Sequence, residues 1–348
     1  MALANPESAA LRRRDLLVAA GASLGLPAWA QARSITDGTG RRVSVPARVQ
    51  RIFPAGPPAA IWLYTLAPDA LVGWPRANRG PELEFLLPGI GNRPEVGRLT
   101  GRGNTTNLEQ LLLSKPDLIV DAGSTRQTFA ELADRVQAQT GIPYALLDGR
   151  LASVAQGYTL LGELTGRQER AGVLARYTTE TLRTVRDRVA RASTQPRVYY
   201  ARGPEGLETG LGGSINVEIF EALGIRHVSA GLQGGLATVP MEQVLAWDPE
   251  VIVTIDQTFA QTVRSNPLWR SVSAVKSGRV HLSPKLPFGW IDFPPSVNRL
   301  PGLWWLASKV HPALFPEDLS VMTRDFYKLF YQVDLNPEQV ARVLAGRD

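Results

Sequence analysis

The chain has 348 residues, which is enough for two domains that each bury a hydrophobic core. Hydrophobic residues make up 44% and charged residues 20% of the sequence, so an intrinsically disordered chain is excluded. The absence of Cys excludes disulfides and thiolate metal sites, and three His are too few for a His-rich metal centre. The net charge is +6, but beyond the N-terminus no basic run is long enough to indicate nucleic-acid binding.

Residues 1–32 are expected to form an export signal. Three consecutive arginines at 12–14 precede a short apolar run at 16–26, and small residues follow at a cleavage site after Ala30 or Ala32. Paired arginines before a weak apolar core favour the twin-arginine type over an ordinary secretory signal. Because no Cys is available at the junction to carry a lipid, we expect a soluble periplasmic protein without a lipid anchor.

Residues 33–150 are expected to form an N-terminal α/β lobe. The pattern predicts a short strand at 51–53, a helix at 59–66 and a helix at 129–140 that Gly141 ends. Between the two helices, a short helix stops before Pro116 and a β-branched apolar run follows, as is typical of a buried parallel strand.

This helix–strand unit, residues 108–120, recurs at 241–253 with an offset of 133 residues. A Glu-Gln pair, a Leu, a Pro, an acidic residue and an Ile-Val pair match between the two segments. Helix–turn–strand units occur in any α/β protein, but the matched spacing favours true repetition. The sequence therefore predicts two similar lobes.

Residues 151–195 are expected to connect the lobes through a long helix at 168–193. Apolar residues form one stripe along this helix, and Arg186 and Arg188 lie among the arginines of its other faces, which we interpret as a solvated surface. At 1.5 Å per residue the helix would run about 35–40 Å, enough to bridge two lobes.

Residues 196–348 are expected to form the C-terminal lobe. The pattern predicts strands at 197–201 and 279–282 and helices at 214–223, 321–329 and 337–344. Motifs of hydrolases, metalloproteases and phosphate-binding loops are absent from the sequence. The three histidines are isolated from one another, so we predict no catalytic residue, metal site or cofactor; they are His227, His281 and His311.

Candidate ligand-binding residues occur in loops that follow strands, where α/β sheets bind ligands. Arginine side chains offer a fork of donors to anionic oxygens, and aromatic rings supply flat apolar walls. Each aromatic could instead belong to the core. For Trp290 a ligand role is favoured, because Pro and Gly should hold its loop, 287–295, rigid and exposed. The predicted ligand-binding residues are Trp74, Arg98, Arg126, Tyr200, Arg202, Trp290 and Asp292.

The whole chain after the signal resembles the solute-binding proteins of ABC importers for iron–siderophore complexes, haem and cobalamin. The resemblance rests on a first hairpin at 35–52, on the segment 107–120, and on matching C-lobe segments at 214–224 and 242–245. Residues 288–300 resemble a subgroup whose ligands include metal chelates and, in some members, molybdate or tungstate.

This resemblance implies an α/β fold of two Rossmann-like lobes with parallel sheets, joined by one long rigid helix, with the ligand in the cleft between them. It also implies that Glu109 and Glu242 dock onto arginines of an ABC permease dimer, although both could simply be first-turn acids stabilised by the helix dipole. Arg202 replaces an aromatic contact of cobalamin binders and favours an anionic ligand. The protein is expected to act as a monomer.

The leading hypothesis is a periplasmic receptor for an iron complex such as a siderophore chelate. The first alternative is a molybdate or tungstate oxyanion held by Arg and backbone N–H groups. Haem, with Tyr199 or Tyr200 as axial ligand, and cobalamin are further options. An exported hydrolase is the remote alternative, since it would need a nucleophile and base that the three scattered His do not provide.

Overall fold

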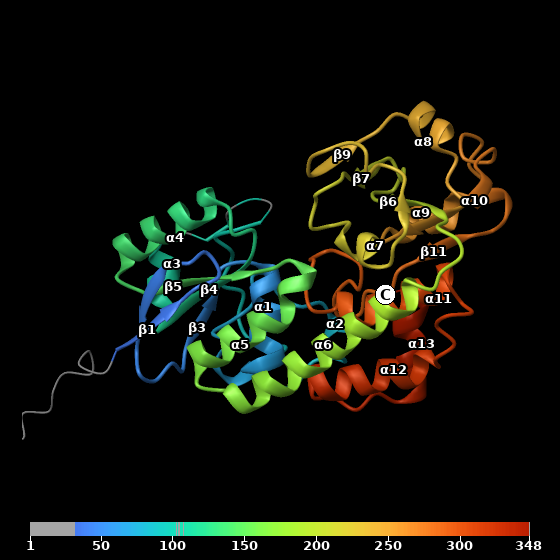
Figure 1. The fold of residues 1–348 in the computed structure, drawn as a ribbon. Coiled ribbons are helices and arrows are strands. Elements are labelled where there is room, and N and C mark those ends of the chain that lie inside the picture. Colours follow the sequence, from blue (N-terminus) through green and yellow to red (C-terminus); the bar gives the residue numbers. More distant parts are fainter. Residues whose placement is uncertain (1–31, 102, 104, 107, 348) are drawn as a thin grey trace, which may run out of the picture.

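The computed structural model describes residues 32–101, 103, 105–106 and 108–347. All but the last residue of the predicted export signal therefore lies outside the described residues. Among the described residues, no helix combines the length and the apolar character that crossing a membrane requires. The chain forms two α/β lobes linked by a long helix and backed by a group of C-terminal helices (Figure 1).

The first lobe is built on a parallel sheet with the strand order β3-β4-β5. Apolar side chains alternate between its two faces, and helices cover both, so nearly every strand residue is buried. A separate antiparallel hairpin, β1–β2, precedes the sheet, as the sequence predicts. The elements up to the linking helix are β1 (Arg33–Thr36), β2 (Arg42–Val45), β3 (Ile52–Pro54), α1 (Pro57–Leu66), η2 (Pro68–Ala70), α2 (Gly80–Leu83), α3 (Leu108–Leu113), β4 (Leu118–Gly123), α4 (Gln127–Thr140), β5 (Tyr144–Asp148), η3 (Leu151–Ser153) and α5 (Val154–Thr165).

The second lobe repeats this plan with the parallel strand order β11-β10-β6-β8. A short antiparallel pair, β7–β9, stands apart from the main sheet. The remaining elements are α6 (Gln168–Val189), β6 (Arg197–Ala201), β7 (Glu208–Gly210), α7 (Glu218–Ala222), β8 (Arg226–His227), β9 (Leu236–Thr238), α8 (Met241–Trp247), β10 (Val251–Thr254), α9 (Gln257–Thr262), α10 (Ser273–Lys276), β11 (Val280–Leu282), α11 (Arg299–Val310), α12 (Leu319–Phe326), the π-helix η4 (Tyr327–Tyr331) and α13 (Pro337–Ala345).

The predicted internal repeat is confirmed at the level of single residues. Helices α3 and α8 are each followed within two residues by a non-glycine residue with positive φ, Lys115 (45°) and Asp248 (39°), which are 133 residues apart. In each lobe an arginine at the start of the neighbouring strand donates to the carbonyl oxygen of that residue: Arg51 to Lys115 (2.9 Å) and Arg197 to Asp248 (3.0 Å). The same backbone turn and the same cap thus recur in both lobes.

Helix α6 runs beneath the first lobe and reaches the second (Figure 1). The prediction that its arginines form a solvated surface is wrong for Arg188. This side chain is anchored to the second lobe. The Arg188 guanidinium lies 5.3 Å from the ring centre of Trp304 and 5.4 Å from that of Phe315, and it donates to the carbonyl oxygen of Leu314 (3.0 Å). An ion pair with Glu317 completes these contacts.

The C-terminal helices also contact the first lobe, so the predicted range 196–348 is not confined to one side of the molecule. The Tyr64 hydroxyl of α1 donates to the carbonyl oxygen of Tyr331 in η4 (2.9 Å), and Arg342 of α13 pairs with Glu84 (2.5 Å). One continuous cluster of buried apolar residues includes strands of both sheets together with these helices. The two lobes therefore share a core.

Several elements differ from the prediction: the long helix ends at Val189 instead of at residue 193, and the segment 321–329 is divided between α12 and η4. The helix expected at 214–223 is shorter, because α7 begins only at Glu218 after a turn. Helix α5 lies in a segment where no helix was predicted, and it packs along α6. Its Gly157 faces the ring of Trp62, where a Cβ atom would approach to 2.5 Å, so this position needs glycine for the close approach.

Candidate functional site

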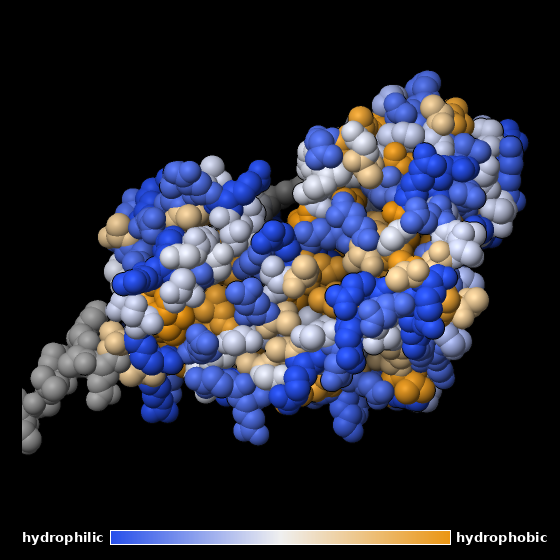
Figure 2. Space-filling view, in the orientation of Figure 1, coloured by the Kyte–Doolittle hydropathy of each residue, from blue (hydrophilic) through white to orange (hydrophobic). Residues whose placement is uncertain are grey.

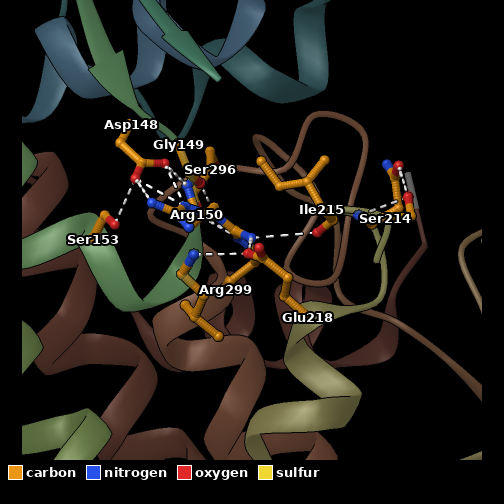
Figure 3. A network of polar contacts seen from close by, with 11 residues as sticks. Asp148, Gly149, Arg150, Ser153, Ser214, Ile215, Glu218, Ser296 and Arg299 are labelled. Carbon is orange, nitrogen blue, oxygen red and sulfur yellow. Dashed lines mark hydrogen bonds and ion pairs between the residues drawn. The ribbon is translucent and has the colours of Figure 1, made fainter. Parts of the chain in front are cut away.

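The candidate site lies where the two lobes meet, at the carboxyl ends of their strands. Parallel strands end at a common edge of their sheet, and that edge is where ligands bind in α/β folds. Figure 2 shows the surface of the molecule indented between the two lobes. In Figure 3, the residues after β5 come together with the turn before α7 and with the start of α11.

Arg299 holds this junction together from inside (Figure 3). Its guanidinium is fully buried and donates to the carbonyl oxygen of Gly149 in the first lobe (2.5 Å) and to the Glu218 carboxylate in the second (3.0 Å). The same oxygen of Glu218 accepts the backbone N–H of Leu151 (2.7 Å). Burial lowers the pKa of the Arg299 guanidinium, and the negative charge of Glu218 opposes that shift. Charge pairing and backbone contacts thus link the lobes at the base of the site.

A second ion pair lies beside the first, directly after β5. Arg150 donates to Asp148 through Nε (2.9 Å) and Nη2 (2.5 Å), and the Ser153 hydroxyl donates to the same carboxylate (2.8 Å). Burial alone would raise the pKa of Asp148, but the hydrogen bonds from Arg150 outweigh it and lower the pKa below its ordinary value. The Arg150 side chain is 66% exposed, so its guanidinium faces solvent at the edge of the first lobe.

Three of the predicted ligand-binding residues lie together at the end of β6. The Tyr200 hydroxyl donates to the Asp292 carboxylate (3.1 Å), and the Arg202 guanidinium lies 3.6 Å from the same carboxylate and 3.5 Å from Glu208. Burial, reinforced by the negative charge of Asp292, raises the pKa of Tyr200 well above its ordinary value. The Nε and Nη1 groups of Arg202 are buried and form no hydrogen bond with the described part of the chain. Both groups instead face carboxylates at ion-pair distance, Nε toward Asp292 and Nη1 toward Glu208, so an anion would compete with these carboxylates for the donors.

Arg98 and Arg126 lie on the first lobe, apart from this cluster. Arg126 is exposed and Arg98 is half-buried. Each Nε donates locally, that of Arg98 to the carbonyl oxygen of Gly103 (2.8 Å) and that of Arg126 to the Ser124 hydroxyl (3.2 Å). Neither guanidinium forms an ion pair with a described residue. They add positive charge to the carboxyl edge of the first sheet, and among the described residues neither contacts Arg202.

The predicted aromatic walls are buried instead. Trp74, Trp290 and Tyr200 are at most 2% exposed. The Trp74 ring packs between Tyr64 and Phe288, with ring centres 5.7 and 5.6 Å apart, so it belongs to the core that the two lobes share. The sequence left open whether these three rings line a ligand site or belong to the core. Their burial fits the core.

The loop at 287–295 is not exposed as predicted, because it folds inward. A Cβ atom on Gly289 would lie 1.9 Å from the carbonyl oxygen of Asp292, so only glycine permits this tight turn. Trp290, Ile291 and Asp292 are all buried, whereas Phe293 is 71% exposed and has a φ of 66°. Positive φ is a strained conformation for a bulky residue. The outward-facing ring of the loop is thus Phe293 rather than Trp290.

The two predicted docking residues, Glu109 and Glu242, are exposed on α3 and α8. Neither carboxylate accepts a hydrogen bond or forms an ion pair within the described ranges. Their positions in the two lobes correspond through the repeat.

Sequence reasoning missed the central ion pairs of the junction. Arg299 lies in the segment 288–300, which resembles a subgroup of the family, and Arg150 follows a strand by two residues, so both carried a usable signal. Their partners could not be inferred, since Arg299 reaches a carbonyl group 150 residues earlier in the chain.

A family model described as periplasmic binding protein matches residues 59–286. The chain belongs to this family of periplasmic solute-binding proteins, which serve ABC transporters. It is 25% identical to the molybdate-binding protein MolA of Haemophilus influenzae over 95% of this chain and 100% of that protein. It is 27% identical to the vitamin B12-binding protein of Yersinia pestis over 47% of this chain and 57% of that protein. Among solved structures, an ABC transporter solute-binding protein from Sulfurospirillum deleyianum superposes with a TM-score of 0.81 at 29% identity, covering 89% of this chain and 98% of that chain.

Proposed function

We propose that this protein captures a small oxyanion of the molybdate class in the cleft between its lobes and delivers it to an ABC permease. The observation that carries the proposal is Arg202, whose Nε and Nη1 donors are buried at the end of β6 and lie 3.6 and 3.5 Å from the carboxylates of Asp292 and Glu208 without forming a hydrogen bond. Unsatisfied buried donors cost free energy that a bound anion recovers. Exposed Arg126 and half-buried Arg98, neither of them ion-paired with a described residue, add positive charge to the edge of the first lobe that attracts the anion.

An oxyanion is favoured over the iron complex that led the sequence analysis. A large chelate needs wide apolar walls, and the aromatic rings expected to supply them are buried in the shared core. The similarity to a molybdate-binding protein over 95% of the chain supports the same choice. The iron complex remains the second candidate because of Phe293, whose ring is 71% exposed on a loop at the end of the second sheet and is free to contact a chelate.

Haem and cobalamin receive less support. The hydroxyl of Tyr199 donates to the carbonyl oxygen of Gly206 (2.9 Å) and that of Tyr200 to Asp292, and both residues have an exposed fraction of zero. An axial bond to haem iron would require either side chain to leave the core. The matched part of the vitamin B12-binding relative is about half of its length.

Titration of the purified chain with molybdate, tungstate, sulfate and a ferric siderophore, followed by intrinsic Trp fluorescence, tests this function. We expect molybdate or tungstate to bind, and Arg202→Gln to weaken that binding by about 100-fold, since a charge-assisted bidentate contact contributes about 2–3 kcal/mol. Arg183→Gln on the exposed surface of α6 is the matched control and should bind like the wild type.

Because Arg202 is buried, circular dichroism of each variant must first establish that it folds. Binding of the ferric siderophore without binding of either oxyanion would overturn the oxyanion proposal in favour of the second candidate. Unchanged oxyanion binding by a folded Arg202→Gln protein would remove Arg202 from the site.

A further inference from the structure

Helices α3 and α8 present the same two exposed side chains, a carboxylate and a leucine one helical turn later. In the first lobe these are Glu109 and Leu112, and in the second Glu242 and Leu245. The leucines are 48% and 41% exposed. Each pair is separated by 133 residues from its counterpart, which is the offset of the internal repeat.

The matching exposure follows from matching packing of the two helices. Leu111 and Val244, the equivalent residues just before the exposed leucines, both have an exposed fraction of zero and fix the rotation of their helices. Residues three apart lie on the same face of a helix, so each carboxylate stands next to its leucine. The two lobes thus present one acid-and-leucine pair each.

A single exposed leucine on a protein surface is ordinary and needs no explanation. What sets Leu112 and Leu245 apart is that they occupy equivalent positions in the repeat, each beside an exposed carboxylate that has no partner among the described residues. A duplicated surface of this kind matches a partner with two equivalent sites, because two-fold related surfaces bind two-fold related patches.

We propose that Leu112 and Leu245 are apolar contacts for the permease, each entering a pocket beside the basic group that binds the neighbouring glutamate. This inference rests on the proposed function, delivery to an ABC permease, and on the prediction from the sequence that Glu109 and Glu242 dock onto that permease. Exposed ion pairs mainly steer and orient two proteins, whereas burial of apolar side chains supplies much of the affinity. The carboxylates therefore guide docking and the leucines stabilise the docked complex.

The first test compares uptake of radiolabelled molybdate by cells that carry Leu112→Ser, Leu245→Ser or both in place of the wild-type chain. We expect the initial rate at limiting protein to fall about five-fold for each single variant and about 25-fold for the double variant, since distant sites contribute additively. Leu268→Ser is the control, because Leu268 is 63% exposed but lies outside the repeated unit. The purified double variant should bind molybdate as the wild type does, which separates docking from ligand capture.

The second test does not depend on the ligand. A photo-crosslinking phenylalanine analogue at position 112 or 245 should crosslink to a membrane-spanning subunit of an ABC importer, identified by mass spectrometry, whereas the analogue at 268 should not. Crosslinking that succeeds when molybdate fails to bind would leave the docking surface intact and refute only the choice of ligand. Normal uptake by the double variant, or absence of the crosslink from both positions, would overturn this inference.

Discussion

At the scale of single residues, two arginines of the same junction should contribute very differently to stability. Arg299 is fully buried and contacts both lobes, while the Arg150 side chain is 66% exposed and contacts mainly its neighbour Asp148. Removing one partner of a buried ion pair leaves an unpaired charge in the interior, whereas exposed pairs are screened by water.

We therefore expect Arg299→Met to lower the free energy of unfolding by about 3–5 kcal/mol and Arg150→Met to lower it by less than about 1 kcal/mol. Urea denaturation of both variants, followed by circular dichroism, gives the two values. Equal losses would show that burial of Arg299 does not govern its contribution to stability.

The sequence could predict that Tyr200 and Arg202 lie near Asp292, because the first two stand at the end of one predicted strand and Asp292 follows another strand of the same lobe. It could not predict on which side of the loop the Trp290 ring lies, since Pro and Gly indicate a rigid turn but not its direction. The inward turn depends on the contact of Gly289 with the backbone of Asp292, which no residue pattern reveals. The roles of these residues in binding stay predictions.

At the scale of elements, periodicity predicted the long helix α6 but not the partners of its arginines. An apolar stripe identifies the buried face of a helix from its own sequence. The partners of Arg188 come from α11 and the segment after it, more than 100 residues later in the chain. Helix α5 was not predicted, although Val154, Tyr158 and Leu161 recur at helical spacing and are buried.

The anchoring of α6 yields a prediction with a matched control on the same helix. Arg188→Ala removes two cation–π contacts, an ion pair and a hydrogen bond from a side chain that is 25% exposed, so unfolding should become easier by about 2 kcal/mol. Arg186→Ala shortens a side chain that is 75% exposed, so it should change the free energy of unfolding by no more than about 0.5 kcal/mol. Thermal unfolding of both variants checks the contrast, and a similar small effect for each would mean that the contacts of Arg188 are not stabilising.

At the scale of the whole molecule, the repeat predicted two lobes but not how firmly they are joined. The second half of the chain returns to the first lobe through η4 and α13, and aromatic side chains from both halves pack together there. These contacts link residues more than 200 positions apart, and only the folded chain brings them together. Shared burial of this extent couples the stability of the lobes.

The shared core predicts that the two lobes unfold together. Leu118 of β4 and Val253 of β10 belong to different sheets but to the same buried cluster. Leu118→Ala should lower the free energy of unfolding by about 2–5 kcal/mol and Val253→Ala by a smaller amount, and each should shift one common transition. Trp fluorescence and far-UV circular dichroism should then give coincident urea curves for the wild type and for both variants. Two separate transitions, with each substitution moving only the one from its own lobe, would show instead that the lobes fold independently and that the contacts of η4 and α13 are too weak to couple them.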